Sequence, residues 1–213
     1  HKVKCCLGNI DNNGIMVEEL IRNNAQIAHI SPAHHFPTGI TMPAPRRYEI
    51  LDWANKAKDR YIIEDDYDSE FRLTGRTIPS LQSIDISEKV IYINTFSKTL
   101  TPNIRVSYMV LPEHLMNRFK NELGFFSTTV SSFEQFTLAA FMDKGYFEKQ
   151  INRMRLHYAR QRKQILSLLA DSPLKNKYKI IKDVKPKAVL DSNKIVFNTK
   201  YAEQTGVGIY IKG

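Results

Sequence analysis

Short apolar runs alternate with amphipathic stretches along the first 143 residues. The apolar runs predict β-strands at 26–30, 61–63, 90–93 and 108–111. A helix is predicted over 46–59, where apolar residues recur at three-residue spacing (Tyr48, Leu51, Ala54 and Ala57). Short apolar strands separated by helical segments are typical of a mostly parallel sheet that helices cover on both faces. The predicted fold class is therefore α/β.

Beyond residue 112 the periodicity becomes helical. Helices are predicted at 113–125, at 131–143, and from Gly145 to about Ala170. Ser131 or Ser132, followed by Glu134, predicts a capped start for the second of them. Further possible strands of a small α/β unit lie at 178–181, 195–197 and 209–211. We therefore expect a large domain over 1–145, a long connecting helix over 146–172 and a truncated small domain over 173–213.

Composition excludes several classes of protein. The two cysteines, Cys5 and Cys6, are adjacent and have no other cysteine to pair with, which excludes a disulfide framework and a cysteine-based metal site. A reducing cytoplasm is therefore the expected compartment. The apolar runs are far shorter than the ~20 residues that span a bilayer, so no membrane association is expected.

The net charge of +9 is unevenly distributed. Residues 144–213 carry 16 basic and 5 acidic side chains, a net of +11, whereas residues 1–143 carry 15 and 17, a net of −2. The basic end could contact nucleic acid or another acidic surface. A solvated lysine-rich surface is the simpler alternative, because no nucleic-acid motif accompanies the charge.

Three polar segments follow predicted strands, where ligands of α/β sheets gather. After the third strand, the hydroxyls of Thr95 and Ser97 and the guanidinium of Arg105 suit a phosphate, and Lys98 is a candidate Schiff-base lysine. After the second strand, residues 64–70 (EDDYDSE) contain five acids, one of which could pair with a protonated heterocycle nitrogen. The third segment, 34–39 (HHFPTG), follows the first strand.

Each segment taken singly has an ordinary structural interpretation. A strand-terminal lysine is usually a surface residue, and an acidic run is more often a solvated turn or a divalent-metal site. His34 and His35 could form a metal pair, but no carboxylate lies at helical spacing from them. His29, inside a predicted strand, is expected to be a core histidine. Their order along the chain, at successive strand ends, makes the three segments informative together.

Taken together, the segments resemble the class I/II aminotransferases, which are pyridoxal 5'-phosphate (PLP) proteins of fold type I. Within them the sequence most resembles the aminotransferase-like domain of the MocR/GabR group of bacterial transcription regulators. The resemblance rests on residues 31–39 (SPAHHFPTG), 62–71 (IIEDDYDSEF) and 95–105 (TFSKTLTPNIR), and it covers roughly residues 10–170.

The resemblance implies a role for each matching residue. Lys98 would form a Schiff base with PLP, Asp65 would keep the pyridine nitrogen protonated, and Tyr67 would donate to the phenolic oxygen of the ring. The phosphate would be held by Thr95, Ser97 and Arg105. The turn containing Pro37 would lie beside the cofactor, although Phe36 stands where the family commonly has an asparagine that contacts the ring oxygen. No metal is implied.

The resemblance also implies a function with three alternatives. The first is an effector-sensing domain of a regulator, in which a small amine or amino acid exchanges with Lys98 and thereby alters DNA binding by an N-terminal helix-turn-helix domain. The second is a catalytic aminotransferase, in which Lys98 also moves a proton. The third is an interaction domain without cofactor.

The expected assembly of the intact protein is a homodimer. The family's Gly-rich phosphate turn and its C-terminal substrate-binding arginine have no counterpart in this sequence, so the chain is expected to be a fragment that does not catalyse by itself. A fragment of this kind is expected to expose apolar surface.

Overall fold

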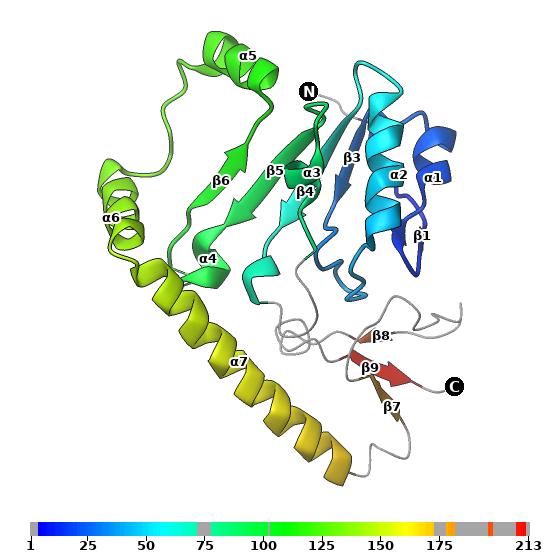
Figure 1. Ribbon diagram of the computed structural model, residues 1–213, viewed down its shortest axis with the longest axis vertical. Coiled ribbons are helices and arrows are strands. Elements are labelled where there is room, and N and C mark those ends of the chain that lie inside the picture. Colours follow the sequence, from blue (N-terminus) through cyan, green and yellow to red (C-terminus); the bar gives the residue numbers. More distant parts are fainter. Residues whose placement is uncertain are drawn as a thin grey trace.

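In a computed structural model of the chain, a four-stranded sheet forms the centre of the molecule (Figure 1). The structure describes residues 4–71, 78–101, 103–172, 178–181, 196–197 and 208–211. The strand order is β3-β4-β5-β6, with β3 (Ile27–Ile30), β4 (Tyr61–Asp66), β5 (Val90–Thr95) and β6 (Ser107–Val110). The first three strands are parallel, and β6 pairs with β5 in the antiparallel sense. The predicted α/β class is therefore confirmed, with a mixed sheet.

Helix α2 (Ala44–Asn55) covers one face of this sheet. Pro43 and Pro45 fix its start. The amide hydrogens of a first helical turn have no partner within the helix, so proline, which has no amide hydrogen, loses nothing there. Ile50, Trp53 and Ala54 are fully buried. They form one apolar core with sheet residues of the same parity, among them Ala28, Ile62 and Val90. The helix begins and ends earlier than the predicted range of 46–59.

The opposite face of the sheet is more open than predicted. Burial alternates along β4, so that Ile62, Glu64 and Asp66 are buried and their neighbours are only half-buried. Ile27 and Met109 lie on the same face of the sheet as these half-buried residues, and both are exposed. The expectation that His29 is a core residue is wrong, because its side chain lies on this open face and is 63% exposed.

Short elements that the sequence analysis did not predict frame the sheet. A hairpin of β1 (Ile10–Asp11) and β2 (Gly14–Ile15) leads into α1 (Val17–Arg22). Gly14 has a φ of 103°, a conformation that favours glycine. The single-turn elements are η1 (Ser69–Phe71), α3 (Leu81–Ile84) and α4 (Phe96–Thr99).

Three helices follow the sheet, as predicted. These are α5 (Glu113–Leu123), α6 (Ser132–Asp143) and α7 (Tyr146–Asp171). Ser131 and Glu134 form the predicted cap of α6, each side chain accepting from the other's backbone amide. Helices α5 and α6 lie beyond β6, away from the rest of the sheet, and neither buries a residue (Figure 1).

Helix α7 contacts the short elements α4 and η1 through two aromatic pairs. The Phe147 ring meets Phe96 of α4 edge-on at 5.8 Å, and the Tyr158 ring meets Phe71 of η1 at 5.2 Å. Arg155 adds a hydrogen bond of 2.6 Å from its Nε to the carbonyl oxygen of Glu70. The first half of α7 is therefore fixed to both short elements that follow the central strands.

Three short strands follow α7, close to their predicted positions. Antiparallel β7 (Tyr178–Ile181), β9 (Gly208–Ile211) and β8 (Val196–Phe197) pair in that order. The division of the chain into domains at residues 145 and 172 stays a prediction. None of the helices in the described part of the chain has the length and apolarity needed to cross a membrane.

Candidate functional site

The parallel strands β3, β4 and β5 bring the three polar segments to one edge of the sheet. Lys98 lies on the single turn α4 directly after β5, and Tyr67 directly follows β4. The Nζ atom of Lys98 lies over the Tyr67 ring, 4.2 Å from its centroid. At this distance the negative face of the ring attracts an ammonium group. The structure thus places the predicted lysine and tyrosine in contact.

The turn after β3 packs on the same tyrosine. The Tyr67 hydroxyl donates to the carbonyl oxygen of His34 at 2.7 Å, and the rings of the two residues are stacked. His34 Nδ1 is 2.7 Å from a carboxylate oxygen of Asp68. His35 Nδ1 instead contacts the Thr38 hydroxyl at 2.8 Å. Burial lowers the pKa of His35, and the neighbouring His34 adds to this effect.

The two histidines therefore point to different partners. No group of three or more His, Cys, Asp or Glu side chains within the described ranges is arranged to hold a metal ion. Pro37, at the tip of the turn, is exposed together with Phe36. The Pro37 ring makes none of the contacts that join this turn to Tyr67.

The three residues predicted to hold a phosphate lie together at the start of α4. The Thr95 hydroxyl accepts from the Ser97 amide at 3.3 Å and so caps the helix. The Ser97 hydroxyl donates to the Ile104 carbonyl at 2.7 Å and accepts from Nη1 of Arg105 at 3.5 Å. The result is a small group of two hydroxyls and one guanidinium, and the two hydroxyl residues lie within three residues of Lys98 along the chain.

Asp65 is separate from these contacts. Its parity along β4 places it on the open face of the sheet, with one carboxylate oxygen 3.4 Å from Nε2 of His29. His29 is the polar partner of this carboxylate within the described residues. The structure therefore joins Lys98 to Tyr67, and Thr95 and Ser97 to Arg105, but it joins neither Asp65 nor Pro37 to them.

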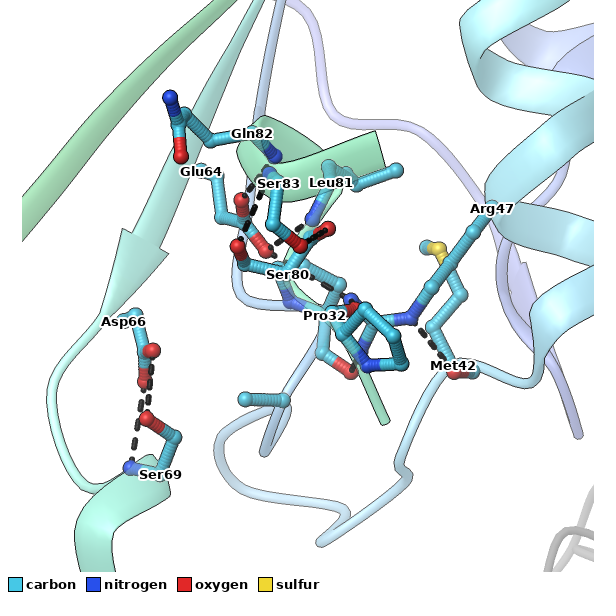
Figure 2. Close-up of polar contacts among 12 residues, drawn as sticks. Pro32, Met42, Arg47, Glu64, Asp66, Ser69, Ser80, Leu81, Gln82 and Ser83 are labelled. Atoms are coloured by element: carbon cyan, nitrogen blue, oxygen red, sulfur yellow. Dashed lines mark hydrogen bonds and ion pairs between the residues drawn. The ribbon is translucent and has the colours of Figure 1, made fainter. Parts of the chain in front are cut away.

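Two of the five acids in residues 64–70 lie within β4 and are buried, so the solvated-turn interpretation is wrong for them. Glu64 is 1% exposed and Asp66 is 4% exposed. The Glu64 carboxylate accepts from the backbone amides of Leu81 and Gln82, at 2.9 Å each (Figure 2). Burial raises the pKa of Glu64, and the two amides together with the Arg47 guanidinium oppose the rise.

Arg47 is the counterion of Glu64 and is not among the residues predicted from the sequence. Its Nη1 lies 3.6 Å from Glu64, and its guanidinium donates to the carbonyl oxygens of Met42, Pro79 and Pro32 at 2.9–3.0 Å (Figure 2). Pro32 and Met42 flank the turn that packs on Tyr67, and Pro79 precedes α3. Arg47 thus ties both segments to the sheet.

A second buried polar group joins β4 to β5. The Tyr92 hydroxyl donates to Asp66 at 2.8 Å and accepts from the Asn94 side-chain amide at 2.9 Å. Asn94 also donates to Glu70 at 3.1 Å. Burial raises the pKa of Tyr92, and the adjacent Asp66 raises it further. The sequence signal for such groups is a polar residue two positions along a strand from a buried apolar residue, and so on the same face of the sheet, as Glu64 is with Ile62.

Comparison with known proteins identifies relatives among transcription regulators, although no family model matches the chain. The HTH-type transcriptional regulator YhdI of Bacillus subtilis is 42% identical over 159 residues, which are 75% of this chain and 34% of that protein. The probable rhizopine catabolism regulatory protein MocR of Rhizobium meliloti is 35% identical over 159 residues, 75% of this chain and 32% of that protein. The chain spans about a third of the length of these curated relatives.

Among solved structures, the fold matches aminotransferases. The kynurenine aminotransferase of Pyrococcus horikoshii, solved in complex with PMP, superimposes with a TM-score of 0.65 at 29% identity, covering 76% of this chain and 42% of that one. The resemblance inferred from the sequence is therefore confirmed. The chain is similar to MocR-type HTH regulators, and it has the α/β fold of the fold type I PLP aminotransferases.

Proposed function

We propose that this chain is the PLP-binding, aminotransferase-like part of a MocR-type transcription regulator, in which it senses an amino compound. The observation that carries the proposal is the approach of the Lys98 amine to the Tyr67 ring at the carboxyl edge of the sheet. The similarity to regulators supports the regulatory role, since YhdI and MocR match over three quarters of this chain.

The residues present fit PLP chemically. An aldehyde requires an amine, which Lys98 offers, and a phosphate requires hydroxyls and a cation, which Thr95, Ser97 and Arg105 offer within one cluster. A pyridine nitrogen requires a carboxylate, and that of Asp65 has His29 as its partner at a loose 3.4 Å. When bound, PLP supplies an aldehyde that captures amines and a ring that withdraws electrons.

Each residue then has a specific task. Lys98 would hold PLP through its aldehyde, and an incoming amino compound would compete with the lysine amine for the cofactor. Tyr67 would donate its phenolic hydrogen to the cofactor oxygen, in place of its hydrogen bond to the carbonyl of His34. Asp65 would hold the ring nitrogen, and Thr95, Ser97 and Arg105 would orient the phosphate. The turn that contains Pro37 would lie beside the cofactor.

The proposed partners follow from the same relatives. The ligand is a small amine or amino acid, and DNA is bound by the helix-turn-helix part of the regulator rather than by this chain. A homodimer is supported by the exposed aromatic residues of α6, Phe133 and Phe136, which would be covered by a second copy. Both cysteines, Cys5 and Cys6, are exposed, which is consistent with a reducing cytoplasm.

Reductive trapping tests the proposal directly. We would add PLP to the full chain, reduce it with borohydride, digest it and locate the added mass. The expected adduct is on Lys98, and it should be absent in Lys98→Ala and present in Lys120→Ala, a change to an exposed lysine of α5. An adduct spread over the exposed lysines and insensitive to Lys98→Ala would refute the assignment.

A catalytic aminotransferase is the second candidate, favoured by the structural match to the kynurenine aminotransferase. The two functions differ in what an added amino acid becomes. An enzyme converts it to an oxo acid and leaves the cofactor aminated, whereas a sensor releases it unchanged. Chromatography of the amino acid after incubation with the PLP-loaded protein distinguishes them.

A further inference from the structure

Beside the candidate site, the ends of β4 and β5 carry a hydrogen-bonded group that we name the strand-end network: buried Asp66, half-buried Tyr92 and buried Asn94. Asp66 and Asn94 are partners in the parallel register, and Tyr92 has the same parity, so the three side chains share one face of the sheet. Asp66 is 4% exposed and Asn94 is 2% exposed. Buried polar groups of this kind hold one arrangement when their hydrogen bonds are satisfied.

The hydrogen bonds of the network run continuously from one strand to the next. Tyr92 links the other two residues, because its hydroxyl donates to Asp66 at 2.8 Å and accepts from Asn94 at 2.9 Å. Burial and the Asp66 charge raise the pKa of Tyr92, so the hydroxyl keeps the proton that it donates. The side-chain amide of Asn94 also donates to the Glu70 carboxylate at 3.1 Å, and its side-chain oxygen accepts from the Thr95 backbone amide at 2.6 Å.

Each end of the network adjoins a residue of the candidate site. Asp66 immediately precedes Tyr67, and it also accepts from the amide and hydroxyl of Ser69, which fixes the turn on the far side of Tyr67. Asn94 immediately precedes Thr95, whose hydroxyl caps the turn of α4 that carries Lys98. The Lys98 amine in turn contacts the Tyr67 ring, so the residues that follow the two ends of the network are linked to each other.

We infer that Asp66, Tyr92 and Asn94 are positioning residues that hold the Tyr67 ring against the Lys98 amine and thereby set the reactivity of that amine. The inference rests on the proposed function in one respect, namely that Lys98 is the lysine that captures an aldehyde. None of the three side chains needs to touch the ligand, because they act through Tyr67 on one side and through Thr95 on the other.

Tyr92→Phe is the sharpest perturbation, because it removes one hydroxyl from the middle of the network and keeps the ring. Tyr48→Phe, at an exposed tyrosine of α2, is the matched control. The measurement is trace labelling of the full chain with acetic anhydride, without PLP, read as the mass of the Lys98 peptide relative to that of the exposed Lys120. Melting curves of the same samples report whether each variant is folded.

We expect the relative labelling of Lys98 to change by about two- to fivefold in Tyr92→Phe, the equilibrium factor of one lost cation–π contact. Asn94→Ala should shift it in the same direction, and Tyr48→Phe should leave it unchanged. Labelling equal to wild type in a folded Tyr92→Phe overturns the inference. If one network variant fails to fold, the other decides. If both fail, the network is structural, and the inference is overturned.

Reductive trapping with PLP on the same proteins separates this inference from the proposed function. Trapping at Lys98 in wild type, with unchanged labelling in Tyr92→Phe, would support the function and refute the positioning. Changed labelling without any trapping at Lys98 would show that the network sets the environment of the amine while PLP is not its ligand. Labelling therefore tests the positioning role of the network, and trapping tests PLP binding at Lys98.

Discussion

Replacing Arg47 with methionine should destabilise the chain severely, because Arg47 is the counterion of a buried carboxylate. Its side chain is 2% exposed and that of Glu64 is 1% exposed. Removing one member of a buried ion pair costs about 3–5 kcal/mol, since the other charge stays in a medium of low polarity. The carbonyls of Pro32, Met42 and Pro79 lose a donor as well. The loss is a large share of the ~5–15 kcal/mol that stabilises an average domain.

Urea unfolding followed by fluorescence measures this loss, because Trp53 is the only tryptophan and is buried on the same helix as Arg47. Arg118→Met is the matched control, since Arg118 forms an exposed pair with Glu122. The double variant Arg47→Met/Glu64→Met should lose less stability than the sum of its single variants, because no charge remains buried. Equal midpoints for Arg47→Met and Arg118→Met would refute the reasoning.

Three further changes have defined outcomes. Arg105→Met should weaken PLP binding about tenfold and leave pyridoxal binding unchanged, as expected for one lost charge-assisted hydrogen bond to the phosphate; absorbance titrations that show equal losses for both ligands would contradict this role. Burial lowers the pKa of His35 from its usual 6.5, so the unfolded chain takes up a proton that the folded chain resists, and the urea midpoint should fall as the pH drops below 6.5; His35→Gln should flatten this dependence, and an unchanged slope would argue against it. Ser131→Ala should cost about 1 kcal/mol and speed amide exchange in the first turn of α6, where Glu134 loses its acceptor; exchange as slow as in wild type would show that the cap is dispensable.

The strands and helices could be predicted because their signals are local. The runs at 61–63 and 90–93 gave strands at nearly the right places, and the Ser131–Glu134 spacing gave the cap of α6. The direction of β6 could not be read from periodicity. The length of its connection contained a signal, because the residues between 95 and 107 are too few for the crossover helix that a parallel strand needs.

The candidate site was predictable in its members and not in its contacts. Strand-end position selected Tyr67 and Lys98, whose approach depends on the parallel register of β4 and β5. Arg47 and Glu64 are 17 residues apart on different elements, and nothing in either local sequence shows that the two charges are buried together. Asn94 shares the parity of Val90, which marks it as buried, but its partners become visible only when both strands are placed.

Helix α7 gives the proposed sensor a mechanical property. Its ring contacts with α4 and η1 are made by Phe147 and Tyr158, and the helix continues from there to Asp171 (Figure 1). At about 1.5 Å per residue, the part beyond Tyr158 is about 20 Å long. As a rigid body, the helix would move its far end by about 1.7 Å for a tilt of about 5° at Tyr158. It would then act as a lever whose short arm rests on α4, which contains Lys98, and on η1, which follows Tyr67.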